Sequence, residues 1–525
     1  MSQASQTMMK GAAILTFAAL FSKILSALYR VPFQNLTGDT GFYIYQQVYP
    51  FYGLFIALCT YAFPVMVSSI LIERQEERER VLKLLTLFLG GVGVAWFTAL
   101  YMGAGLIADF MGDPQLKPLI ELSAWPFLLL PVLSAGKGWF QSEGNMVPSA
   151  VTQVVEQTIR VIAIIGAAFI LTTQGASLYT VGEGAVAGSI AGVVAGALIL
   201  IFFIRKQLFK KKERLSFKKG DATLLRALLV RGTAIAMVSM LLVLYQLVDA
   251  LNVYSLLTGY TGDADQAKVL KGIYDRGQPI VQMGVVAATS LSLAIVPVIA
   301  SDYERKRFSD VKQKAALAVK TGLVFGAAAT VGLISIMKPL NQFLFQNEDG
   351  SAVLSIFAAA VFLTSVIVTI NAVLQGTGSY HTAAWTAAAS LVLKYVCNVL
   401  LVPVYGTGGA AIATVLSLAA VAVVLTLKVY KKIGLRLYKP FYLRLSAGLI
   451  VMGAGVTLLL MIWTPETRFS SGAASIIAAI TGAYLFFMIS WSGSLFTKEE
   501  LREIPLGRKI DRLFGRRIEK GGRSS

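Results

Sequence analysis

Long apolar runs separated by short polar segments dominate the chain. About fourteen of them approach the roughly 20 residues that a helix needs to cross a bilayer. The first twelve spans fall into two sets of six, followed by a pair near the C-terminus. The predicted spans are Gly11–Val31, Tyr43–Leu71, Leu84–Ile107, Leu119–Ala135, Val151–Leu171 and Ala185–Ile204, then Leu228–Val253, Ile273–Ala300, Leu317–Ile336, Val353–Leu374, Ala383–Leu401 and Gly409–Leu427, and last Phe441–Trp463 and Gly472–Trp491.

The composition supports an all-α integral membrane protein. The 525 residues are 56% hydrophobic and 14% charged, with a mean hydropathy of +0.68. A soluble core cannot hide that much apolar surface. Backbone polar groups must be paired inside hydrocarbon, so spanning segments are helices or closed barrels, and runs of this length predict helices.

The chain has a net charge of +19, and its basic residues are distributed along the sequence in a way that indicates the topology. Most of the lysine and arginine residues lie in connections on the same side as the N-terminus, and few lie in the alternate connections. The positive-inside rule therefore places both termini in the cytoplasm, with the chain crossing the cytoplasmic membrane many times. Basic bursts between apolar runs favour anionic lipids as partners and argue against nucleic acid.

The two sets of six spans repeat one another. At an offset of 234 residues, Gln141 matches Gln375, Gly144 matches Gly378 and Arg160 matches Lys394. Two six-helix lobes joined by a basic loop are typical of transporters, which hold the substrate between the lobes. We expect lobes at 1–204 and 223–437, a cytoplasmic linker at 205–222, a helix pair at 438–493 and a basic tail at 494–525. The tail is either a solvated segment or an amphipathic helix on the membrane surface.

Signals of enzymatic chemistry are absent from the sequence. There is no GxxxxGK[ST] and no HExxH, and the single His381 lies near no cysteine or serine that it could activate. The two cysteines, Cys59 and Cys397, lie far apart in apolar runs, which argues against a disulfide or a metal site. We expect a protein that is not an enzyme and has no cofactor, driven by a gradient, by the membrane potential or by its substrate's own flow.

Cations within the spans are the informative residues. Lys23 and Arg30 lie seven residues apart on one face of the first span, and Arg276 begins the eighth. A cation at membrane depth costs at least about 2.5 kcal/mol on insertion scales, so it should face a wet cavity or a partner. An anionic substrate fits such a cavity. Snorkelling towards an interface is the alternative for Lys23 and Arg30.

Two further cations have acids within reach. Glu156 precedes Arg160 by one helical turn, which favours a local ion pair. Lys394 and Asp249 are each isolated in sequence, so we expect them to pair across the second lobe, with Asn398 one turn from Lys394 completing the cluster. A cation-coupled switch is the alternative role for this cluster.

The segment Lys137–Val161, KGWFQSEGNMVPSAVTQVVEQTIRV, resembles a motif of the multidrug/oligosaccharidyl-lipid/polysaccharide exporter superfamily, in its polysaccharide-biosynthesis and stage V sporulation protein B-like branch. The opening KGAAILTFAALFSKILSALYRVPF and IYDRGQPIVQM at Ile273 are similar to it as well. The resemblance implies a V-shaped, MATE-like bundle with alternating access that moves undecaprenyl-linked sugars, lipid II among them.

The resemblance also implies roles for particular residues. Lys23 and Arg30 resemble paired first-helix cations of lipid II flippases, and Asp275 with Arg276 resembles their acidic–basic pair. Asp249 and Asn398 resemble positions of a sodium site found in some members. The chain departs from the pattern in the second span, QQVYPFYGLF, which lacks a cation, and at Lys394, whose ammonium would replace sodium.

The sequence therefore predicts a flippase for undecaprenyl-pyrophosphate-linked saccharides, with Arg30, Lys23 and Arg276 holding the pyrophosphate. A cation-coupled multidrug antiporter of the same superfamily is the alternative, with sodium or a proton as coupling ion. A membrane scaffold for envelope-synthesis enzymes is a third possibility, from another class of protein.

Overall fold

The computed structural model describes residues 3–205, 218, 220–378, 380–434, 439–492, 495–496 and 500. Most of the predicted linker and tail lie outside these residues. The described part is helical throughout and contains no strand, which confirms the all-α prediction. In the first half the helices are α1 (Gln3–Leu28), α2 (Arg30–Ile56), the π-helix η1 (Ala57–Ala62), α3 (Phe63–Glu73), η2 (Gln75–Glu77), α4 (Arg78–Met111), η3 (Pro114–Leu116), α5 (Lys117–Ala124), η4 (Trp125–Leu129), α6 (Leu130–Ser142), α7 (Val147–Thr173) and α8 (Leu178–Arg205).

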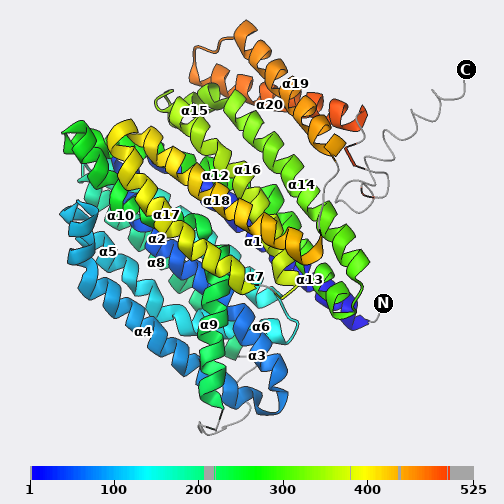
Figure 1. Ribbon diagram of the computed structural model, residues 1–525. Coiled ribbons are helices and arrows are strands. Elements are labelled where there is room, and N and C mark those ends of the chain that lie inside the picture. The colour runs from blue at the N-terminus through cyan, green and yellow to red at the C-terminus, as the bar shows by residue number, and fades with distance from the viewer. Residues whose placement is uncertain are drawn as a thin grey trace, which may run out of the picture.

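The second half repeats this arrangement and adds a final pair. Its helices are α9 (Asp221–Ser239), α10 (Leu241–Thr261), α11 (Ala264–Asp275), α12 (Gly277–Gly284), α13 (Val286–Glu304), α14 (Phe308–Ser335), α15 (Met337–Phe345), α16 (Ser351–Gly376), α17 (Tyr380–Tyr405) and α18 (Thr407–Ile433), then α19 (Lys439–Ile462) and α20 (Arg468–Ser492). The pair α19 and α20 packs on α14 and α15 at one edge of the bundle (Figure 1).

Thirteen helical stretches in the described part are long and apolar enough to cross a membrane. The stretch Ile14–Glu73 contains two predicted spans. Conversely, α9 and α10 together form the predicted seventh span, because the helix breaks at Met240. The predicted eighth span is divided among α11, α12 and α13. When the helices are grouped in this way, they account for all fourteen predicted spans.

The first reversal of the chain lies later than the sequence suggested. Tyr29 keeps helical angles (φ −64°, ψ −23°), so the helix continues past α1 as far as Thr37. Gly38 then adopts φ 69° and ψ −176°, a conformation that essentially only glycine accepts without strain. Arg30 is therefore two turns from the reversal. We call the side of the bundle where α1 begins the inner side, predicted to be cytoplasmic, and the opposite side the outer side.

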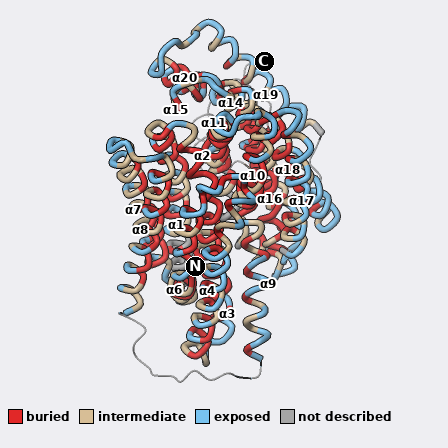
Figure 2. Tube along the Cα trace, turned by 90° about the vertical axis from the view of Figure 1, so that its left-hand side faces the viewer, coloured by how far each residue is buried: buried red, intermediate tan, exposed pale blue. Residues whose placement is uncertain are grey.

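Helices pack mostly within their own half. The closest pairs are α7 with α8 and α3 with α6 in the first half, and α17 with α18 and α14 with α16 in the second. The halves meet where α2 packs on α10 and α11, where α1 packs on α12 and α13, and where α9 packs on η1 and α3. Buried residues gather in the interior of the bundle and exposed ones lie at its margins, many of them the apolar residues expected against lipid (Figure 2).

Candidate substrate cavity

A cavity with about 320 Å³ of room for water-sized molecules lies between the two halves. Its first-half wall comes from α1, α2, η1 and α7, and its second-half wall from α9, α10, α12, α13 and α16. The π-helix η1 and the break at Met240 both border it. Irregular helix geometry at the cavity is consistent with a functional site, because π-bulges are frequent at functional sites.

Contacts between the halves close the cavity on its outer side. The Asp39 carboxylate accepts hydrogen bonds from Arg276 at 2.9 and 2.6 Å, and the Gln47 side chain donates to the carbonyl of Ala250 at 3.1 Å. The first residue of α2 that lines the cavity is Tyr49, which follows these contacts along the helix as it runs towards the inner side. The cavity therefore lies on the inner side of a closed outer contact.

Lys23 faces this cavity, as predicted. Its side chain is half-buried and lines the first-half wall. It forms no ion pair or hydrogen bond with any residue that the structure describes. A cation at membrane depth without an acidic partner is available to an anionic ligand.

Arg160 also lines the cavity and is held by neutral groups. Its guanidinium donates to the hydroxyls of Tyr29 and Tyr45 at 2.8 and 3.1 Å, to Ser189 at 3.3 Å and to the side chain of Gln157 at 3.4 Å. None of these partners carries a charge, although the Glu156 carboxylate, which also lines the cavity, lies near enough to attract the guanidinium.

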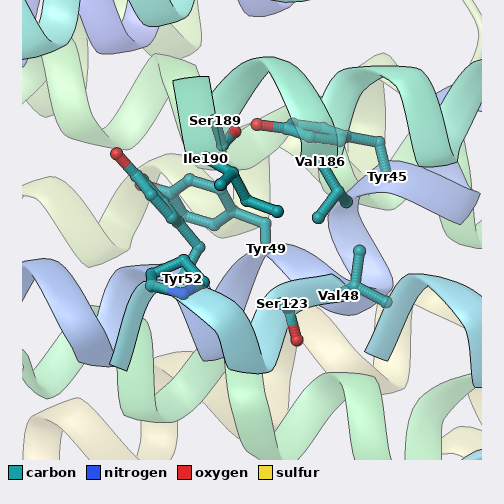
Figure 3. A pocket seen from close by; sticks show the side chains of 9 residues that line it. Tyr45, Val48, Tyr49, Tyr52, Ser123, Val186, Ser189 and Ile190 are labelled. Atoms are coloured by element: carbon teal, nitrogen blue, oxygen red, sulfur yellow. The ribbon is translucent and has the colours of Figure 1, made fainter. Parts of the chain in front are cut away.

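Aromatic rings enclose the Arg160 guanidinium. It lies 4.3 Å from the ring centre of Tyr52 and 5.6 Å from that of Tyr49, and both tyrosines line the cavity. Figure 3 shows these rings together with Tyr45 and Ser189 around a small pocket between α2 and α8. Cation–π contacts stabilise the charge without neutralising it. Sequence reasoning missed these tyrosines, although their spacing along α2 was a readable signal.

The predicted Glu156–Arg160 ion pair is wrong. Glu156 instead lies 3.8 Å from the ammonium of Lys137 on α6. Lys137 is 2% exposed, so it needs a counter-charge more than Arg160 does, whose nitrogens already have four hydrogen-bond acceptors. A spacing of one helical turn permits a pair but does not require it.

Arg30 was predicted to line the cavity, and the structure places it just behind the wall instead. It is fully buried, and none of its three guanidinium nitrogens has a hydrogen-bond partner among the described residues. The guanidinium lies 4.2 Å from the ring centre of Tyr49, which does line the cavity. The ring of Tyr49 thus separates Arg30 from the cavity, at the closed outer end of the cavity.

The prediction that Arg276 and Asp275 face the cavity is also wrong. Arg276 is fully buried and neutralised by Asp39, and it donates further to Asn347 at 2.6 Å. Asp275 pairs with Lys271 at 2.7 Å. Each charge has found a partner at the outer contact, so neither is free for a ligand. The four-residue spacing of Lys271 and Asp275 was the signal that the sequence offered.

The predicted pair of Lys394 and Asp249 is confirmed. The ammonium lies 2.6 Å from the carboxylate, and both residues are almost fully buried in the second half. Asn398 takes part as expected, accepting from Lys394 at 3.0 Å and donating to Asp249 at 2.9 Å. Thr414 accepts a further hydrogen bond from Lys394 at 2.7 Å. The cluster is satisfied internally, which suits a bracing role.

Comparison with known proteins places the chain among membrane transporters. Residues 8–302 match the family described as polysaccharide biosynthesis protein, and residues 234–400 match the MatE family. The chain is 41% identical over 524 residues to an uncharacterized membrane protein, YabM, of Bacillus subtilis (strain 168), with 98% of each chain covered.

Two further comparisons concern flippases. The chain is 25% identical over 448 residues to the lipid II flippase MurJ of Bacillus subtilis (strain 168), covering 79% of this chain and 81% of that one. A solved structure of lipid II flippase MurJ in an inward closed conformation superposes with a TM-score of 0.70 at 16% identity, covering 92% of this chain and 99% of that chain. The structural likeness confirms the predicted fold class.

Proposed function

The chain belongs to the polysaccharide biosynthesis protein family, within the superfamily that the sequence resembles, and on this premise we propose that it is a flippase for undecaprenyl-pyrophosphate-linked saccharides in the cytoplasmic membrane. The observation that carries the proposal is that Lys23 and Arg160 line one wall of a cavity between two lobes, and that Lys23 has no ion-pair partner among the residues that the structure describes. Both termini are proposed to lie in the cytoplasm, which places the cavity on the cytoplasmic side of the outer contact, the side where such lipids are made.

The diphosphate is bound by the first-half wall. Lys23 supplies a mobile point charge, and Arg160 supplies a guanidinium held in a fixed orientation. Arg30 adds positive potential through the ring of Tyr49. A low-dielectric cavity strengthens these attractions relative to water, while the polyprenyl tail stays in the bilayer.

Translocation follows from an exchange of contacts between the lobes. The outer contact, centred on Asp39 and Arg276, must separate for the head group to leave on the outer side. On the inner side the halves meet through Arg80 on α4 and Asp221 on α9, and this contact must part for the head group to enter and re-form before it leaves, so the head group is exposed to one side at a time.

The test is translocation of a fluorescent undecaprenyl-pyrophosphate saccharide in proteoliposomes. Lys23→Met is expected to reduce the rate at least tenfold, because it removes the free cation. Lys117→Met is the matched control, since Lys117 begins α5 on the outer side and does not line the cavity. Full activity of Lys23→Met, or no activity of the unchanged protein, would refute the proposal.

A multidrug antiporter is supported less well. Such a protein needs an acid that is free to bind an organic cation, whereas Glu156 lies against Lys137 and Asp249 pairs with Lys394. Transport of a lipophilic cation by the protein in proteoliposomes, with no movement of the lipid, would favour this alternative. Stable binding to envelope-synthesis enzymes without any transport would favour a scaffold.

A further inference from the structure

The second half contributes a wall to the cavity that has no charge among its described residues and is largely apolar, with polar side chains gathered on α16. On α16, Thr364, Val368, Asn371 and Gln375 all line it, and their spacing of four, three and four residues places them on one face of the helix. The charged residues among the described lining, Lys23, Glu156 and Arg160, all come from the first half. The two walls therefore differ in chemistry.

Two polar side chains of this wall are buried and lack partners. Thr364 is 5% exposed and Asn371 is 7% exposed, and neither the hydroxyl of Thr364 nor the Oδ1 of Asn371 has a hydrogen-bond partner among the described residues. The other threonine of α16 is satisfied within its own helix: the hydroxyl of Thr369 donates to the carbonyl of Ser365 at 2.7 Å. Buried polar atoms are nearly always paired in folded proteins, so these two atoms point to a ligand that completes them.

Resting on the proposed function, we infer that this face of α16 is the subsite for the saccharide and that the sugar in contact with it is uncharged. An amide has a carbonyl acceptor and two N–H donors, and a hydroxyl both donates and accepts, which matches the hydroxyl groups of a sugar. A carboxylate on the same sugar would lose its hydration with no cation on this wall to replace it.

The arrangement also gives the substrate an orientation. The diphosphate lies against Lys23 and Arg160 on the first half, and the sugar reaches α16 on the second half. One molecule therefore contacts both lobes, and its binding depends on their relative position. A bare diphosphate would contact the first half alone, so the sugar is what links substrate binding to the movement of the lobes.

The experiment compares two probes, undecaprenyl diphosphate and undecaprenyl diphosphate carrying one N-acetylhexosamine, bound to the full-length protein in nanodiscs. The unchanged protein is expected to bind the glycosylated probe more tightly. Thr364→Val and Asn371→Leu should each lower that preference roughly threefold to tenfold, the effect of one hydrogen bond. Their affinity for the bare diphosphate should stay the same, which also shows that the variants are folded.

Thr369→Val is the matched control on the same helix, because the Thr369 hydroxyl does not reach the cavity. Gln375→Leu, at the less buried end of the face, is a second test that disturbs packing least. An unaltered preference in the Thr364→Val, Asn371→Leu double variant overturns the inference, as does equal binding of both probes by the unchanged protein. The proposed function survives either result, whereas it fails if neither probe binds.

A third probe tests whether the sugar bound at this subsite must be uncharged. Replacing the N-acetylhexosamine by a hexuronic acid is expected to weaken binding by at least tenfold, and Gln375→Arg should restore it by supplying a cation. Equal or tighter binding of the acidic probe to the unchanged protein would contradict the uncharged subsite.

Discussion

Asp39 and Arg276 form a two-bonded ion pair that joins the two halves of the bundle at the outer side of the cavity. Nε and Nη2 of the arginine lie 2.9 and 2.6 Å from the two carboxylate oxygens, and the arginine is fully buried. A pair in this position contributes to the closed outer contact and is absent once the lobes separate there. It should therefore bias the protein towards the conformation seen here.

Removing this pair should open the outer side. Asp39→Asn is expected to shift the equilibrium at least tenfold, because about 1.4 kcal/mol suffices for that and leaving the buried Arg276 without its counter-charge costs more. Spin labels at the exposed outer residues Gln115 and Glu348, with Cys59 and Cys397 replaced, should report a new population at longer distance. Asp39→Arg combined with Arg276→Asp should reverse the shift in part. An unchanged distance distribution in Asp39→Asn would contradict the assignment.

The Arg160 cluster should depend on guanidinium geometry as well as on charge. Arg160→Lys keeps the charge but cannot reach Tyr29, Tyr45 and Ser189 together, so buried hydroxyls lose their partner. We expect a loss of about 1–3 kcal/mol in stability and slower lipid translocation, measured by thermal unfolding in detergent and in proteoliposomes. Arg231→Lys, at an exposed position on α9, is the control that should change neither. Normal behaviour of Arg160→Lys would mean that only the charge matters.

The sequence predicted the fold and one charged cluster well, for identifiable reasons. Apolar runs of span length leave few alternatives in a bilayer, so the helices could be read directly. Lys394 and Asp249 are each isolated at membrane depth, and two such charges almost require one another. Both residues belong to the second half, so their ion pair could be predicted without knowing how the lobes face each other.

The cavity residues were harder to predict because they depend on where the lobes meet. Lys23 and Arg30 share a helix face, yet only Lys23 lines the cavity, since Tyr49, from the part of α2 beyond Gly38, covers the face at the level of Arg30. Arg276 found its partner 237 residues away, in a segment that looked like a connecting loop. Sequence spacing reports neighbours within a helix and says little about contacts between distant ones.

The second-half cluster should behave as a coupled unit. Lys394→Met and Asp249→Leu each leave one buried charge without its partner, and each is expected to cost about 3–5 kcal/mol. The double variant should cost much less than the sum, because no unpaired charge remains. Thermal unfolding of the four proteins measures the coupling directly. Additive effects would show that the two charges do not stabilise each other.

Translocation is proposed to be independent of sodium, because the ammonium of Lys394 already occupies an oxygen-lined cation position. Its Nζ lies within 2.6–3.1 Å of oxygens from Asp249, Asn398, Thr414 and the carbonyl of Ala410. Hard cations prefer such oxygen ligands, so the tethered charge and a sodium ion would compete for one place.

Replacing sodium by potassium or choline should therefore leave lipid translocation by the unchanged protein as it was. Lys394→Ala removes the ammonium and leaves the oxygens, and it should acquire a rise in melting temperature with sodium that choline does not give, because an ion that binds only the folded state stabilises it. The Lys394→Ala, Asp249→Asn double variant is the control and should lose this response. Sodium-dependent translocation by the unchanged protein would show that its coupling ion binds elsewhere, since Lys394 leaves no room for one at Asp249.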